Sequence, residues 1–231
     1  MKKHYLFFIE FVFLCSLCLI PPLLTPLSSS YHPQIDFSSI SLQQLVFLLI
    51  GILLYLQQKD SFFTPFAIPA MENSRTKMGF ILYSGFFLLA FGELTVSASL
   101  IEFAAQTVGR GKYDLPSLPA LPHHFTEYVI CILIFLSSAF YEEAMYRMYL
   151  PAMLAKICHI KLSVRMSTIV AEITAAVLFA LSHRYLGYFA VVNAACAAVF
   201  LRICYRKSGS IFPGILAHFI YNIMMLFLMG L

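Results

Sequence analysis

The chain has 231 residues, of which 61% are hydrophobic and 11% charged, and its net charge is +4. Soluble domains carry about a quarter charged and about half apolar residues, so this composition excludes an ordinary soluble enzyme. The small positive charge is spread over short loops and does not indicate a nucleic-acid-binding protein. We therefore expect one integral membrane domain.

Seven apolar segments approach the length of about 20 residues that crosses a bilayer as a helix. They lie at residues 5–27, 41–57, 79–105, 126–149, 166–185, 187–204 and 211–230. They predict an all-α, polytopic transmembrane bundle of about seven to eight membrane helices. Residues 1–125 supply the amino-terminal helices and a linker. Residues 126–231 form the core that carries the chemistry.

The amino terminus is similar to a secretory signal, but Glu10 interrupts its apolar stretch and no convincing cleavage site follows. We therefore expect a retained first helix. Basic residues favour the cytoplasmic side of a membrane. Their distribution predicts a multi-pass protein of the plasma membrane with a cytoplasmic amino terminus. On the same side we expect residues 58–78, 150–165 and 205–209, and on the opposite side the carboxyl terminus.

The fourth segment contains three ionisable residues, Glu142, Glu143 and Arg147, within "FYEEAMYRMYLP". A charged side chain at bilayer depth costs on the order of 3 kcal/mol unless it finds a partner inside the protein. Glu143 and Arg147 are four residues apart and can pair across one helical turn. An ion pair of this kind would explain Glu143 as a structural residue whose charge Arg147 neutralises. Glu142 still needs a partner, which we expect from another helix.

Two histidines at membrane depth are the candidates for that partner, His183 in "FALSH" and His218 in "HFIYN". A lone histidine in an apolar helix is more often a packing residue. The fourth segment, however, continues past Pro151 to a turn near Lys161 and then returns as a second helix. Counting about 1.5 Å per residue along both arms places His183 within about one turn of the height of Glu142.

Carboxylates, imidazoles and a carboxamide in a buried site are suited to hydrolysis of an amide by water. Glu142 with His183 could act as the general base. His218 and Asn222 share a helix face and could donate hydrogen bonds to the developing oxyanion. In this scheme Glu143 and Arg147 orient the reacting groups.

A metalloprotease is the alternative chemistry, because two histidines and one glutamate form a known catalytic zinc set. Glu142, His183 and His218 would be the ligands. The H-E-x-x-H motif is absent, so these ligands would come from three separate helices. The sequence leaves open whether the cofactor is zinc or whether there is none.

Three linked motifs in this region resemble those of the CAAX protease and bacteriocin-processing family of intramembrane proteases, including its CAAX prenyl protease 2-like members. The motifs are Glu142-Glu143-x-x-x-Arg147, Phe179-x-x-x-His183 and His218-x-x-x-Asn222. The resemblance covers about residues 126–226. One departure is Met148, where the family often has glycine.

This resemblance implies an all-helical membrane core that hydrolyses peptide bonds. It implies that Glu142 activates water beside His183, with His218 and Asn222 at the oxyanion. Eukaryotic and archaeal members of the family trim prenylated CAAX proteins, and many bacterial members process or resist peptides or have no known substrate. The implied partner is therefore a peptide or protein substrate at the lipid bilayer, prenylated or not.

Two other functions remain open at this point. Buried glutamates and histidines also form relays in ion or solute transporters, although the internal repeats typical of transporters are not visible here. A non-catalytic membrane scaffold or immunity protein could retain the same residues. Among the remaining polar residues, we expect Glu172 to pair with Lys156. We expect the side-chain amide of Asn193 to reach across to a neighbouring helix.

Overall fold

The structure, a computed structural model, describes residues 2–25, 36–57, 91–96, 99–100, 107 and 121–230. Every regular element within these ranges is helical, which confirms the all-α prediction. Ten helices have defined bounds: α1 (Lys2–Cys18), α2 (Ile20–Leu24), α3 (Leu42–Gln57), α5 (Phe125–Glu142), the π-helix η1 (Glu143–Tyr149), α6 (Leu150–Cys158), α7 (Val164–Ser182), the 3-10 helix η2 (Arg184–Leu186), α8 (Tyr188–Ser208) and α9 (Phe212–Gly230).

Two helical runs within the described residues are long and apolar enough to cross a membrane, Phe125–Cys158 and Val164–Leu186. Shorter apolar helices occupy Phe8–Cys18, Leu42–Gln57 and Phe212–Phe227. Most of the predicted segment at 79–105 and of the linker that follows lies outside the described residues. A total of seven to eight membrane helices therefore stays a prediction.

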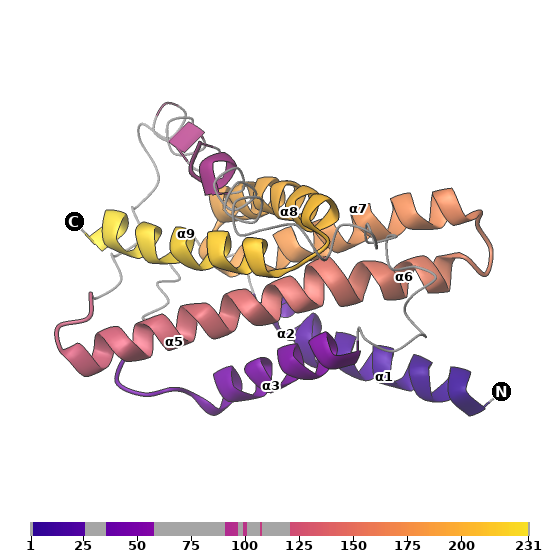
Figure 1. The fold of residues 1–231 in the computed structure, drawn as a ribbon, viewed down its shortest axis with the longest axis horizontal. Helices are drawn as coiled ribbons and strands as arrows, with labels where there is room; N and C mark the ends of the chain where they lie inside the picture. Colours follow the sequence, from indigo (N-terminus) through magenta and orange to yellow (C-terminus); the bar gives the residue numbers. More distant parts are fainter. Residues whose placement is uncertain are drawn as a thin grey trace.

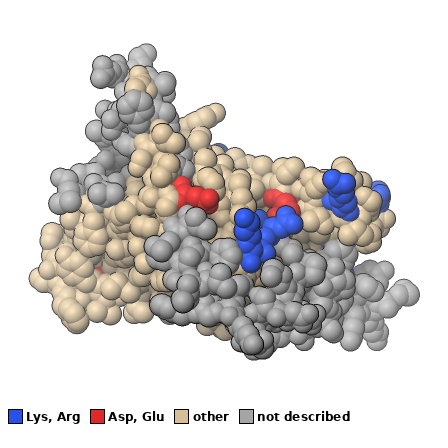
Figure 2. Space-filling model, turned by 45° about the horizontal axis from the view of Figure 1, so that its top comes forward, with Lys and Arg blue, Asp and Glu red and all other residues tan. Residues whose placement is uncertain are grey.

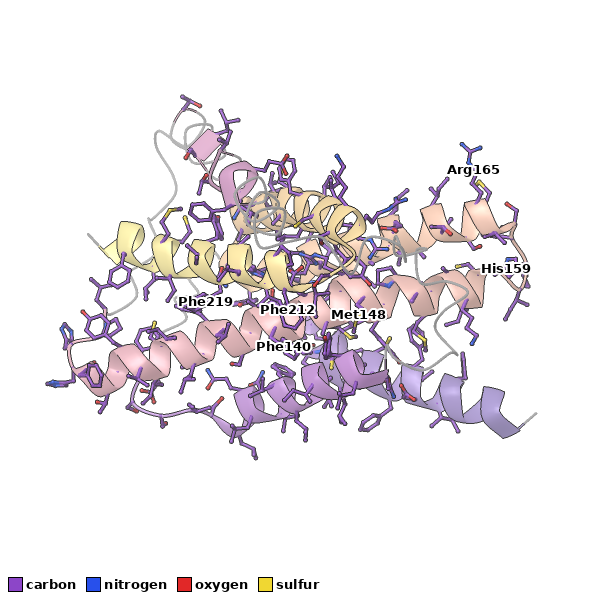
Figure 3. All side chains as sticks on the ribbon, in the orientation of Figure 1. Phe140, Met148, His159, Arg165, Phe212 and Phe219 are labelled. Carbon is purple, nitrogen blue, oxygen red and sulfur yellow. The ribbon has the colours of Figure 1, made fainter. Side chains whose placement is uncertain are left out.

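The longest feature is a helical rod made of α5, η1 and α6, which turns back at residues 159–163 into α7 (Figure 1). Ser163 begins α7 by accepting a hydrogen bond from the backbone N–H of Met166 at 3.3 Å. His159 and Arg165 lie at this turn, far from the middle of the bundle (Figure 3). The predicted hairpin is thus present, and its two arms pack along each other.

Aromatic packing fixes the carboxyl end of α5. The ring of Tyr55 on α3 contacts Phe140 on α5 and Phe212 on α9, with centroid separations of 6.1 and 5.7 Å (Figure 3). Phe47 stacks on Tyr141 at 4.6 Å. Gly51 allows the close approach, since a Cβ there would lie 3.1 Å from the Tyr141 Cα. The residue before Glu142 is therefore held firmly against α3.

Helices α8 and α9 complete the core. α8 ends at Gly209, whose φ of 66° is the left-handed conformation that favours glycine at a helix end. Asn193 donates a hydrogen bond to the hydroxyl of Tyr221 on α9 at 2.7 Å, which confirms the predicted crossing of its amide. α1 begins at the end of the molecule where the α6–α7 turn lies, and α9 ends at the opposite end (Figure 1).

Candidate active site

The central feature of the site is the π-helix η1, whose seven side chains are all buried. A π-helix closes its hydrogen bonds five residues apart, as the bond from the Leu150 N–H to the Met145 carbonyl shows. Pro151 follows in the first turn of α6 and has no N–H to offer the carbonyl of Arg147 four residues earlier. That carbonyl instead accepts a hydrogen bond from the guanidinium of Arg202 on α8.

Glu143 and Arg147 form the ion pair expected from their spacing. Arg147 Nη2 lies 3.4 Å from Glu143 Oε1, and the two side chains are 2% and 1% exposed. The guanidinium carbon of Arg147 also lies 4.0 Å from the ring centroid of Phe179 on α7. Burial at this level makes the two charges dependent on each other, because neither has water to replace a lost partner.

Glu142 is oriented by Ser138, one turn earlier on α5, whose hydroxyl donates to Glu142 Oε1 at 3.0 Å. The second oxygen, Oε2, faces two imidazoles. It lies 3.9 Å from His183 Nε2 and 3.7 Å from His218 Nε2. The structure therefore brings these three side chains together, at the height the antiparallel hairpin predicts for His183.

His183 stands at the end of α7, where the chain leaves the α-helical conformation with φ −93° and ψ 5°. Its Nδ1 lies 2.9 Å from the carbonyl of Phe179, which can only accept a hydrogen bond. Nδ1 therefore carries the hydrogen, and in the neutral ring Nε2 presents its lone pair toward Glu142. In this neutral form His183 offers an acceptor at the centre of the site.

His218 on α9 is held from the other side by Glu143. Its Nδ1 lies 3.2 Å from Glu143 Oε1, so Glu143 contacts both this imidazole and the guanidinium of Arg147. Because a carboxylate can only accept, Nδ1 carries a hydrogen, and the ring can also be protonated on Nε2. In that protonated form Nε2 is a hydrogen-bond donor. α9 can approach because Gly214 has no side chain, and a Cβ there would lie 3.0 Å from Glu143 Oε2.

Asn222 lies one turn beyond His218 on α9 and is half-buried. Across the part of the chain that the structure describes, its side chain makes no hydrogen bond. Of the six predicted site residues, five thus form a connected cluster and Asn222 is placed next to it by helical register. The separations between Glu142 Oε2 and the two imidazoles exceed a direct hydrogen bond.

A zinc site is not formed by these residues as they are placed. Zinc ligands lie about 2.0–2.1 Å from the metal, which puts the ligand atoms of a tetrahedral site roughly 3.4 Å apart. The distances from Glu142 Oε2 to the two imidazoles are longer, at 3.7 and 3.9 Å. Among the described residues, no group of three His, Cys, Asp or Glu side chains is arranged to hold a metal ion.

Two residues of the site were missed by sequence reasoning, Ser138 and Arg202, and the partner of Glu172 was not predicted. Ser138 has a local signal, since it precedes Glu142 by four residues. Arg202 has no such signal in the sequence, because its contact with the Arg147 carbonyl joins residues far apart in the chain. Glu172 pairs with Arg202, with a shortest separation of 2.6 Å.

The fold and the cluster define an integral membrane protein with glutamates and histidines gathered at the centre of its helices. Residues 124–224 match the family described as Type II CAAX prenyl endopeptidase Rce1-like. This segment contains all six predicted site residues, and the match supports a CAAX protease assignment for this part of the chain. No curated protein and no solved structure matched the chain.

Proposed function

We propose that the protein hydrolyses a peptide bond inside the membrane with water activated by Glu142. The observation that carries the proposal is the convergence of Glu142 Oε2 on the Nε2 atoms of His183 and His218. Oε2 is buried and accepts no hydrogen bond among the described residues. The separations between Oε2 and the two imidazoles are too long for direct hydrogen bonds, and we propose that the reacting water bonds to these polar atoms.

In the first step the water oxygen attacks the carbonyl carbon of the substrate and forms a new C–O bond. Glu142 takes the proton that water loses, as a general base. The lone pair on His183 Nε2 accepts the second hydrogen of the water and so aims the oxygen. Ser138 keeps Glu142 in this orientation through its bond to Oε1.

The electrons of the carbonyl double bond move onto the substrate oxygen, which becomes an oxyanion. Protonated His218 donates to it through Nε2, and the amide of Asn222 supplies a second hydrogen bond. One such donor in a water-poor site is worth about 3 kcal/mol in the transition state. The carbonyl double bond then re-forms, the C–N bond breaks and the leaving nitrogen takes the proton from Glu142, which gives an amine and a carboxylic acid that loses its proton to water as it leaves the site.

We propose a scheme in which no step uses a metal ion, and the alternative is zinc held by Glu142, His183 and His218. Chelation tests this point directly. We expect activity to survive treatment with a strong zinc chelator. Loss of activity that zinc restores would contradict the metal-free reaction and favour Glu142, His183 and His218 as ligands.

The proposed substrate is a membrane-associated peptide with a CAAX-type carboxyl terminus, and a prenyl group would anchor it beside the apolar helices. Figure 2 shows Lys and Arg at the end of the molecule where α6 turns into α7. Lys161 and Arg165 belong to this turn. By the preference of basic residues for the cytoplasmic side, we propose that this end and the amino terminus of α1 face the cytoplasm of a plasma-membrane protein.

The test uses the full chain in lipid nanodiscs with a farnesylated CAAX peptide, its unprenylated counterpart and an unrelated peptide. Glu142→Gln should lower kcat by about 10²–10⁴-fold, the range of general base catalysis. The matched control is Glu127→Gln at the amino end of the same helix, where glutamine keeps an oxygen for the N–H groups of His123 and His124, and it should cleave like the wild type. Equal cleavage by Glu142→Gln and wild type would reject the assigned role.

The same panel separates the other functions. A non-catalytic scaffold cleaves none of the peptides in either form. A transporter would show ion or solute flux into proteoliposomes that Glu142→Gln abolishes, again without cleavage. Cleavage of the farnesylated peptide alone would establish the prenylated substrate class.

A further inference from the structure

A second polar cluster lies beside the site, where α7 and α8 meet η1. Arg202 Nε donates to Glu172 Oε2 and Arg202 Nη2 donates to Glu172 Oε1, both at 2.6 Å. The two side chains are 16% and 19% exposed, so water only partly screens them. A two-point bond between a planar guanidinium and a carboxylate fixes the direction in which the remaining nitrogen points.

That remaining nitrogen, Nη1, donates to the carbonyl of Arg147. Pro151 cannot supply the N–H that bonds to this carbonyl in a regular α-helix, and Arg202 provides a donor from outside the helix. A buried carbonyl without a partner is costly. Arg202 thus replaces the hydrogen bond that the proline removes.

The consequence reaches the reacting groups through the π-helix. Arg147 and Glu143 share η1, and Glu142 is the residue just before it. Glu172 lies on α7, which ends at His183. The Glu172–Arg202 pair therefore ties the helix that leads to His183 to the segment that carries both glutamates.

We propose that Arg202, held by Glu172, is a positioning residue for the hydrolysis. By bonding to the Arg147 carbonyl, it sets the place of Glu142 and Glu143 relative to the two imidazoles. For activity this inference rests on the proposed function. The placement of the cluster can be tested without it.

Arg202→Met removes every donor and should lower kcat by about 10²-fold with KM little changed, the effect of a small displacement at a reacting group. Arg202→Lys keeps a donor for the carbonyl and should retain more activity. The exchange Glu172→Arg with Arg202→Glu restores the ion pair between α7 and α8 but places a carboxylate against the Arg147 carbonyl. It should recover thermal stability and not kcat.

The control is Arg206→Met, one turn later on α8 and exposed, which should behave as wild type. Recovery of kcat by the charge exchange would overturn the proposal, because it would mean that the pair serves only to join α7 and α8. So would full activity in Arg202→Met.

A second measurement does not depend on peptide cleavage. The side-chain ¹⁵N resonances of His183 and His218, assigned with His→Gln variants, report the surroundings of both rings. We expect the His218 resonances to shift in Arg202→Met and in the charge exchange, and to stay near wild type in Arg206→Met. If the wild type cleaves nothing, the proposed function fails, and shifted resonances still support the positioning role. Resonances unchanged in all variants would overturn it.

Discussion

Replacing Glu143 by glutamine tests how the buried charges depend on each other. Glutamine has nearly the same shape and keeps an oxygen that His218 Nδ1 can bond to. It removes the negative charge 3.4 Å from Arg147 Nη2, and the Arg147 side chain is only 2% exposed. The guanidinium cannot regain water without a rearrangement of the core.

Removing one partner of a buried ion pair costs roughly 3–5 kcal/mol. The contact between Arg147 and Phe179 exists before and after the change, so it offsets nothing. The retained amide oxygen preserves the contact to His218. We therefore expect Glu143→Gln to lower the free energy of unfolding by about 3 kcal/mol, the lower end of that range.

The assay is a titration with SDS in mixed micelles, followed by far-ultraviolet circular dichroism because the chain has no tryptophan. The double variant Glu143→Gln with Arg147→Met removes the stranded charge as well. It should regain most of the lost stability, since a buried pair exchanged for apolar groups is often neutral. A single variant as stable as wild type, or a double variant less stable than the single, would refute the reasoning.

Two further variants address the orientation of the glutamates. Ser138→Ala removes the hydrogen bond to Glu142 Oε1 and should lower kcat about 10-fold with KM little changed. The lost bond should also lower the free energy of unfolding by about 1 kcal/mol. An unchanged kcat would show that Ser138 does not orient Glu142. Gly214→Ala places a Cβ 3.0 Å from Glu143 Oε2 and should cost about 1–3 kcal/mol of stability. Gly92→Ala is its control, because a Cβ there meets nothing within 4 Å, and equal stability of these two variants would contradict the close approach of α9.

The helical class and much of the hairpin could be predicted from the sequence, because apolar length and helical rise are local properties. The segments predicted at 126–149 and 166–185 correspond to α5 with η1 and to α7. The pairing of Glu143 with Arg147 follows from their spacing of four residues. The same arithmetic put His183 near the height of Glu142.

The π-helix could not be predicted in this way, because it depends on tertiary contacts. Pro151 signals that the Arg147 carbonyl loses its usual donor, but the sequence does not name a replacement. That role falls to Arg202, which reaches the carbonyl only because α8 packs beside η1. Glu172 likewise meets Arg202, a partner that counting along the hairpin does not suggest.

Residue type and spacing alone determined that this chain places charges within membrane-length helices, and which of them lie one turn apart. Only the packing of α7, α8 and α9 around η1 decided which atom of each side chain faces which partner. Spacing within a helix follows from a constant rise and turn. The relative rotation of separate helices depends on how all their side chains fit together.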